Sequence, residues 1–151
     1  MKKNDAINIK SNVTLELFDE QGRLMETRRV HNLVTTLGKY MAAAQIVAVP
    51  GIVTPGWMEL GTGSGQTTAS SILAAYIAGS RTVLDSKTRT NAIVTMVCTF
   101  PPGTGTGAIT EAGIFNVATQ NTTDLLVYAS FAVINKAAGG TLTATWTLTF
   151  V

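Results

Sequence analysis

The sequence predicts a mainly β protein: an antiparallel β-sandwich or jelly-roll-like single domain that carries one or two short helices. Residues 141–151 alternate apolar and threonine side chains, which is the period of a β-strand. From residue 81 onward, further extended segments are separated by turn residues at intervals typical of sandwiches. A chain of 151 residues can bury a core of its own, so we expect residues 1–151 to form a single β-rich domain with an amino-terminal arm, residues 1–10.

The first half of the chain predicts a hairpin, a helix and a short strand. Apolar residues alternate with polar ones over residues 13–17, Asp-Glu-Gln-Gly at residues 19–22 supplies a turn, and an extended pattern resumes over residues 23–30. A helix of about three turns is predicted at about residues 35–47, because a threonine can cap the following run of helix formers. After a loop rich in proline and glycine, residues 57–60 predict a short strand.

A glycine-rich segment, residues 61–65, follows that strand and precedes a second possible helix at about residues 70–78. This order can mark a phosphate-binding loop, and Asp85 falls near the distance expected of a ribose-binding acid. The glycine spacing matches neither the dinucleotide pattern nor a Walker loop, however, and the later strands look antiparallel. We therefore interpret residues 61–65 as a flexible surface loop.

The second half of the chain is predicted to be nearly all strand. Residues 93–100 have apolar or threonine side chains on both faces, which predicts burial on both sides. Prolines and glycines over residues 101–107 predict a loop. The predicted strands comprise residues 81–84, 90–100, 109–117, 125–134 and 142–151.

The last strand has an unusual second face. An ordinary solvated strand would mix in Lys and Glu, but this face is a neutral row of threonines: Thr141, Thr143, Thr145, Thr147 and Thr149. Such a face indicates contact with another protein, or with a second sheet surface of the same domain.

Composition restricts the classes of partner. Charged residues make up only 13% of the chain, against about 25% in a typical soluble protein, and the net charge is +2. Scattered basic residues give no support for nucleic-acid binding.

The most apolar stretch, residues 41–53, is shorter than the roughly 20 residues of a membrane helix, so we expect no membrane partner. Lys2 and Lys3 lead into polar residues, so we expect synthesis in a cytoplasm without a secretory signal. We expect the single Cys98 to be a small core side chain.

Catalytic chemistry finds little support in the sequence. The one histidine, His31, falls at a predicted strand-to-helix junction with no nucleophile motif beside it. No Cys or His cluster has the spacing of metal ligands, and the dispersed acids leave a glycosidase pair unsupported. We expect a protein that is not an enzyme, with no catalytic, cofactor-binding or metal-binding residues and no cofactor.

One acidic residue stands in an apolar string. Glu111 lies within Ile-Thr-Glu-Ala-Gly-Ile-Phe at residues 109–115, and a carboxylate in such a strand must find a partner or turn outward. Our hypothesis is a structural ion pair between Glu111 and Arg81.

Several motifs, taken in order, resemble small virion proteins of tailed bacteriophages. The resemblance covers most of the chain and rests on His-Asn-Leu-Val-Thr at residues 31–35, Leu-Gly-Thr-Gly at 60–63, Arg81, the strand ending at Phe100, Glu-Ala-Gly-Ile-Phe at 111–115 and the closing strand at 142–150. Proteins of this pattern include capsid decoration (cement) proteins and the related amino-terminal modules of tail-collar fibres. The resemblance implies a β-sandwich or jelly roll that assembles as a dimer or trimer, and it transfers no catalytic residues.

The function implied is a structural one. Such a protein binds the major capsid protein on the outside of the capsid lattice, after synthesis in the host bacterial cytoplasm, and stabilises the shell. Candidate contact residues are the threonine row and two loops that contain Gly63, Ser64, Pro101 and Pro102. A tail, collar or baseplate component of the virion is the alternative, although a fibre module usually continues into a repetitive shaft. A carbohydrate- or receptor-binding module is more remote, because it needs exposed aromatic rings in a cleft.

Overall fold

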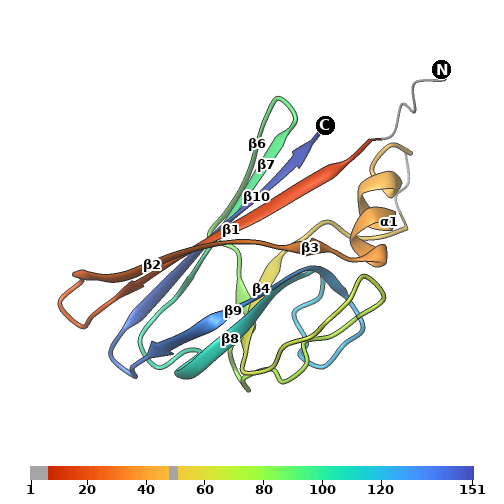
Figure 1. Ribbon diagram of the computed structural model, residues 1–151. Helices are drawn as coiled ribbons and strands as arrows, with labels where there is room; N and C mark the ends of the chain where they lie inside the picture. The colour runs from red at the N-terminus through yellow and green to blue at the C-terminus, as the bar shows by residue number, and fades with distance from the viewer. Residues whose placement is uncertain (1–6, 48–50) are drawn as a thin grey trace.

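The computed structural model describes residues 7–47 and 51–151, which form two antiparallel five-stranded sheets packed as a sandwich (Figure 1). Sheet A has the strand order β2-β1-β10-β7-β6 and sheet B the order β3-β9-β8-β4-β5. The predicted β-sandwich fold class is therefore confirmed. The elements in chain order are β1 (Ile9–Phe18), β2 (Leu24–His31), β3 (Leu33–Val34), α1 (Thr36–Ala44), β4 (Trp57–Gly61), β5 (Thr82–Val83), β6 (Ser86–Thr90), β7 (Ile93–Phe100), β8 (Gly107–Phe115), β9 (Leu125–Lys136) and β10 (Thr141–Phe150).

The core lies between the two sheets and follows the alternation of the strands. In β10, the central strand of sheet A, Leu142, Ala144, Trp146 and Leu148 are buried. The threonines between them and Phe150 are half-buried. Trp146 and Cys98, on adjacent strands, are both fully buried. From sheet B, Met58, Leu60 and Ile114 belong to the same apolar cluster. Trp146 therefore belongs to the core, and Cys98 is the small core side chain that the sequence predicts.

Hairpins join neighbouring strands, and one of them corrects a prediction. The predicted hairpin at residues 13–30 is β1–β2, in which both Gln21 N–H and Arg23 N–H donate to Asp19 Oδ1 at 2.9 Å. The predicted strand at residues 90–100 begins too early, because β7 starts at Ile93. Residues 86–90, which were not predicted to be a strand, form β6 and pair with β7 in a hairpin. Asn91 has a φ of 52° in its turn, a conformation that asparagine tolerates better than most residues.

Helix α1 is held against sheet B by its first residues. The Thr35 hydroxyl accepts the Gly38 N–H at 3.0 Å and donates to the Leu125 carbonyl at 2.7 Å, so it caps the helix and ties it to β9. A Cβ on Gly38 would lie 2.1 Å from the Leu126 carbonyl oxygen, so only glycine permits this approach. The helix predicted at about residues 35–47 is thus present as α1. No helix in the described residues has the length and apolar character needed to span a membrane.

The second predicted helix, at about residues 70–78, is wrong. This segment is irregular and lies over the outer face of sheet B, where Tyr76 forms an isolated bridge with Gly61. The N–H groups of Ala74 and Ala75 donate to the Glu111 carboxylate instead of to helical carbonyls. A buried charged acceptor thus outweighs the helix propensity of the local sequence.

Candidate functional site

The two sheets have very different outer faces. Residues 62–80 cross the outer face of sheet B, and Leu73 from this segment packs on Phe115, Leu125 and Tyr128 in a second buried cluster. The outer face of sheet A carries the threonine row and is formed by strands whose inner faces meet the core. Among the described residues, the chain therefore covers the outer face of sheet B, and no segment crosses the outer face of sheet A in the same way.

Glu111 fastens the covering segment to sheet B. Its Oε1 accepts N–H groups from Gly63 at 3.1 Å and Ala75 at 2.7 Å, and its Oε2 accepts the Ala74 N–H at 3.1 Å. The residue is fully buried, so these charge-assisted bonds replace its hydration. A Cβ on Gly61 would lie 2.4 Å from Glu111 Oε1, which explains the glycine at the end of β4. The loop interpreted from sequence as a flexible surface loop is in fact bound by the protein's own carboxylate.

Tyr128 lies beside Glu111 on the next strand of the sheet. Burial raises the pKa of Tyr128 to about 12, and the neighbouring Glu111 charge acts in the same direction. Tyr128 is 3% exposed. Its phenol therefore stays protonated under ordinary conditions and packs as part of the covered face.

Arg81 belongs to a separate buried cluster, and the predicted Glu111–Arg81 ion pair is wrong. The Arg81 guanidinium pairs with Glu59 Oε2 at 3.0 Å and with Asp124 Oδ2 at 3.4 Å. It also stacks 3.6 Å from the centroid of the Phe115 ring and donates to the Val117 carbonyl at 2.7 Å. We call Arg81, Glu59 and Asp124 the buried charge cluster.

Strand register explains why Arg81 meets Glu59 and not Glu111. Met58 lies opposite Thr82, so the residue before Thr82 reaches the neighbouring Glu59, whereas Glu111 lies opposite Gly61. Sequence reasoning missed Glu59, although it carries the same signal as Glu111. It is an acid between two buried apolar residues of a short strand.

The threonine face is the outer face of sheet A. The register places Thr145 between Thr14 and Val97, and Thr143 between Glu16 and Thr99. Hydroxyl and methyl groups therefore dominate the middle of the sheet, while charges such as those of Arg29 and Lys10 occur toward its edges and ends. We define the threonine face as the outward residues Thr14, Thr95, Thr99, Thr141, Thr143, Thr145, Thr147 and Thr149.

The other predicted contact residues occupy two separate places. Gly63 is half-buried and Ser64 exposed, and both belong to the segment that covers sheet B. Pro101 and Pro102 are exposed, and the Lys136 ammonium donates to the Pro101 carbonyl at 3.0 Å. These prolines directly follow Phe100, which lies opposite Leu142, so they lie near the Thr141 end of the threonine face. The structure brings the prolines close to the threonine row but not Gly63 and Ser64.

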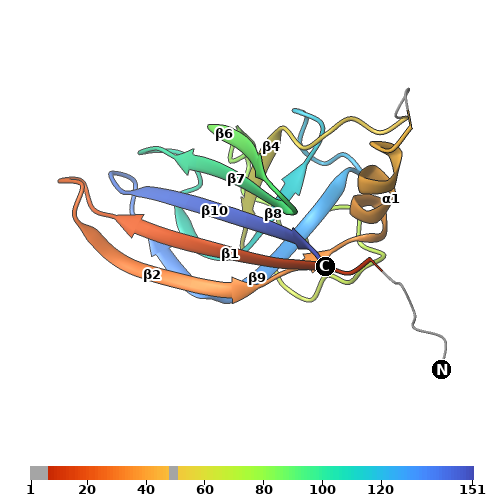
Figure 2. The same ribbon diagram turned by 90° about the horizontal axis from the view of Figure 1, so that it is seen from above.

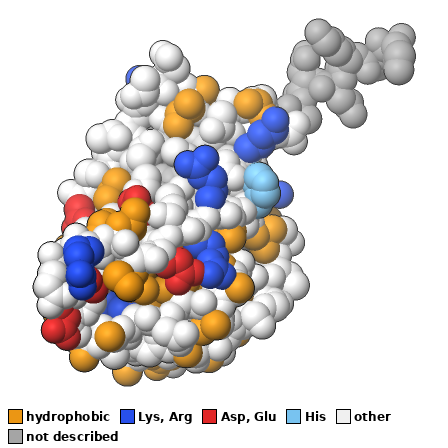
Figure 3. Space-filling view, turned by 60° about the vertical axis from the view of Figure 1, so that its left-hand side comes forward, with side chains coloured by type: hydrophobic (Ala, Val, Ile, Leu, Met, Phe, Trp, Pro, Cys, Tyr) orange, Lys and Arg blue, Asp and Glu red, His pale blue; other side chains and the backbone are white. Residues whose placement is uncertain are grey.

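Charge is unevenly distributed over the surface. Figure 3 shows acidic side chains toward the left of the view and His31, the single histidine, to their right. In sequence terms, Glu16, Asp19, Glu20 and Glu26 belong to the part of the β1–β2 hairpin nearest its turn. No group of three or more His, Cys, Asp or Glu side chains in the described residues could hold a metal ion.

Comparison with known proteins returned no match: no protein-family model, curated protein or solved structure resembles the chain significantly.

Proposed function

We propose that the chain is a structural virion protein that binds the outer surface of a tailed-phage capsid and stabilises it. The observation that carries the proposal is the contrast between the two sheets. The outer face of sheet B is covered by residues 62–80, which Glu111 holds down, whereas none of the described segments forms such a layer over the threonine face of sheet A. The order of motifs that resembles decoration proteins gives this open face its partner, the major capsid protein.

The threonine face suits a contact that is repeated many times over a lattice. Its central residues Thr143, Thr145 and Thr147 are half-buried, uncharged and fixed on the middle strand of a five-stranded sheet. β-Branched side chains have few rotamers to lose on binding. The threonines themselves carry no charge to desolvate, although Glu16 lies beside Thr143 and Arg29 beside Thr14. Each contact can therefore be modest, while many copies together resist expansion of the shell.

Rigidity of the covered side supports the same role. The buried charge cluster and the Glu111 carboxylate hold the segment over sheet B through contacts that are inaccessible to solvent. A protein that transmits force between neighbouring subunits needs such internal contacts, because residues 62–80 would otherwise detach from sheet B before the contact between subunits broke.

Copy number in purified particles tests where the protein binds. The phage that carries the chain is purified, and the stained band of the protein is compared with that of the major capsid protein. Hundreds of copies per particle are expected for a protein on the capsid exterior. A handful to dozens would overturn the decoration assignment and favour the alternative, a tail, collar or baseplate component.

A pair of matched variants tests the binding face. Capsids that lack the protein are mixed with purified wild type, Thr145→Lys or Thr119→Lys, and bound protein is measured after sedimentation. Thr145 lies at the centre of the threonine face, whereas Thr119 is exposed on the loop after β8. We expect Thr145→Lys to reduce binding at least about tenfold, since a desolvated charge in an interface costs several kcal/mol, and Thr119→Lys to bind like wild type. Equal binding of the two variants would contradict the assignment of the threonine face.

The more remote alternative is a carbohydrate- or receptor-binding module. Trp146 is fully buried and Trp57 is half-buried, while Tyr40 and Tyr76 are exposed but belong to different segments. Specific binding on a glycan array, abolished by substitution of either tyrosine, would favour this alternative over a purely structural role.

A further inference from the structure

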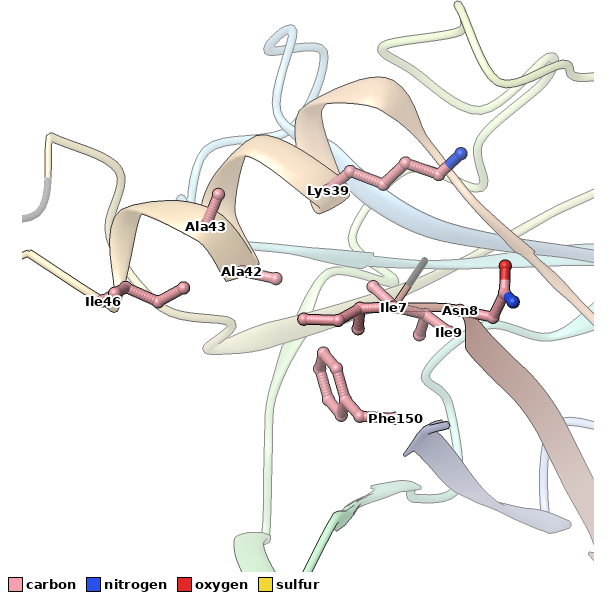
Figure 4. A pocket seen from close by; sticks show the side chains of 8 residues that line it. All are labelled: Ile7, Asn8, Ile9, Lys39, Ala42, Ala43, Ile46 and Phe150. Carbon is pink, nitrogen blue, oxygen red and sulfur yellow. The ribbon is translucent and has the colours of Figure 1, made fainter. Parts of the chain in front are cut away.

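A groove with apolar walls opens beneath helix α1, at the end of the sandwich where β10 finishes (Figure 4). Its first hollow has a volume of about 550 Å³ and lies between Ala42 of α1, Ile46 just after the helix, and the strand residues Ile9 and Phe150. A second hollow of about 420 Å³ shares Ala42 and Phe150 with the first. We call the two hollows together the α1 groove.

Large apolar side chains at the α1 groove are exposed. Ile7 is 78% exposed and Ile46 is 84% exposed, and both line the first hollow. Exposed apolar side chains that converge on a concave surface are typical of a protein-binding site, whereas isolated ones carry no such meaning.

At the opposite end of the molecule, the β1–β2 hairpin projects and carries exposed apolar side chains. Leu24 is 54% exposed and Met25 is 63% exposed, and both directly follow the β1–β2 turn. Asp19 Oδ1 accepts two N–H groups across this turn, so the projection is ordered before it meets a partner and little entropy is lost on docking. We call residues 19–25 the hairpin tip.

The charges at the two ends are opposite in sign. Lys39 lines the first hollow, Lys87 and Arg89 line the second, and none of the described residues that line either hollow is acidic. The hairpin end carries Glu16, Asp19, Glu20 and Glu26 against Arg23 and Arg28. This complementarity favours contact between unlike ends and disfavours contact between like ends.

The two ends cannot meet within one molecule. They lie at opposite ends of β1, whose ten residues span about 33 Å, and Figures 1 and 2 both place the hairpin tip and α1 on opposite sides of the sandwich. A contact between them must therefore join different copies, and it is heterologous, because each copy contributes a different surface. Such contacts close into a ring or continue as a filament.

We propose that the hairpin tip of one copy docks in the α1 groove of a second copy, with Leu24 and Met25 covering the apolar walls and the acidic hairpin end facing the basic rim. The inference deepens the proposed function, since it names the surfaces through which copies join beside one another on a lattice. It is tested on the purified protein without capsids, so its failure leaves the capsid assignment standing.

The test measures the mass of the full chain in solution by sedimentation velocity over a concentration series. Wild type is expected to form species larger than a monomer. Met25→Lys alters only the tip and Ile46→Lys alters only the groove, and each is expected to raise the concentration for half-association by about 30-fold or more, as for hot-spot residues. Val117→Lys, an equally drastic change of an exposed apolar residue far from both surfaces, is the control and should associate like wild type.

Mixing the two variants gives the decisive result. A Met25→Lys copy keeps an intact groove and an Ile46→Lys copy keeps an intact tip, so a 1:1 mixture is expected to form a dimer although neither variant associates alone. The proposal is overturned if wild type stays monomeric, if either variant associates like wild type, or if the mixture does not dimerise. It is also overturned if association persists in both variants but disappears when residues 1–6 are removed, because the arm would then be the contact. Circular dichroism and melting of each variant exclude loss of folding.

Discussion

Replacing Glu111 by glutamine tests whether this carboxylate fastens the segment over sheet B. In the structure the two carboxylate oxygens accept three N–H groups at 2.7–3.1 Å, and the residue is fully buried. Gln can keep its oxygen at the position that serves Gly63 and Ala75, but its NH₂ group then faces the Ala74 N–H. The bond to Ala74 is lost, which leaves its buried N–H without an acceptor, and the two remaining bonds lose their charge assistance.

The expected cost follows from those two changes. A hydrogen bond to a charged group contributes about 1.5–3 kcal/mol, and an unsatisfied buried donor costs about 1–3 kcal/mol. Allowing for overlap between these terms, we expect Glu111→Gln to lower the free energy of unfolding by about 2–4 kcal/mol. For a protein of this size that corresponds to a fall in Tm of roughly 4–16 °C.

Urea unfolding followed by tryptophan fluorescence measures this loss, and amide hydrogen exchange locates it. Exchange should accelerate most at Gly63, Ala74 and Ala75, whose N–H groups contact the carboxylate. Glu20→Gln, at an exposed position, is the matched control and should change stability by less than about 0.5 kcal/mol. An unchanged urea midpoint for Glu111→Gln, with unchanged exchange at the three amides, would refute the reasoning.

Three further predictions concern the helix contact, the buried charge cluster and pH. Gly38→Ala places a Cβ against a backbone carbonyl and should destabilise the protein by about 3 kcal/mol in urea unfolding, whereas Gly51→Ala, with nothing within 4 Å, should have little effect. Arg81→Met leaves two buried carboxylates without their partner and should cost about 3–5 kcal/mol, measured in the same way; a loss below 1 kcal/mol would contradict this account. Burial raises the pKa of both Cys98 and Tyr128 to about 12, so the folded state retains protons that the unfolded state releases. These two groups leave stability unchanged well below pH 9 and should lower it as pH rises from about 9 through 12, with a smaller fall in Cys98→Ala, measured by melting temperature against pH.

Local pattern was sufficient for most strands and for α1, because alternation and capping are properties of neighbouring residues. Thr35 caps the helix as the sequence indicated, and the last strand has the two faces that its alternation predicted. One error had a local cause as well. The turn at Asn91 lacks glycine or proline, so the predicted strand began at residue 90 and β6 was not predicted as a separate strand.

The contacts of the candidate site depend on residues far apart in the chain, and these could not be predicted. Glu111 was recognised as an acid in need of a partner, but its partners are backbone N–H groups of residues 63, 74 and 75, 36 to 48 positions away. Arg81 was recognised as a partner, but strand register places it beside Glu59. Backbone donors of an irregular segment leave no pattern in a sequence.

The sequence by itself determined that this chain is a β-sandwich whose closing strand has one apolar and one threonine face, since a period of two residues is enough to assign side chains to opposite faces. It did not determine what covers each outer face. The three-dimensional arrangement of the described residues shows that residues 62–80 cross sheet B and that none of these residues forms a similar layer over the threonine face of sheet A. The physical reason is that covering a sheet depends on long-range bonds to buried charges such as Glu111, and their geometry exists only once the strands are in register.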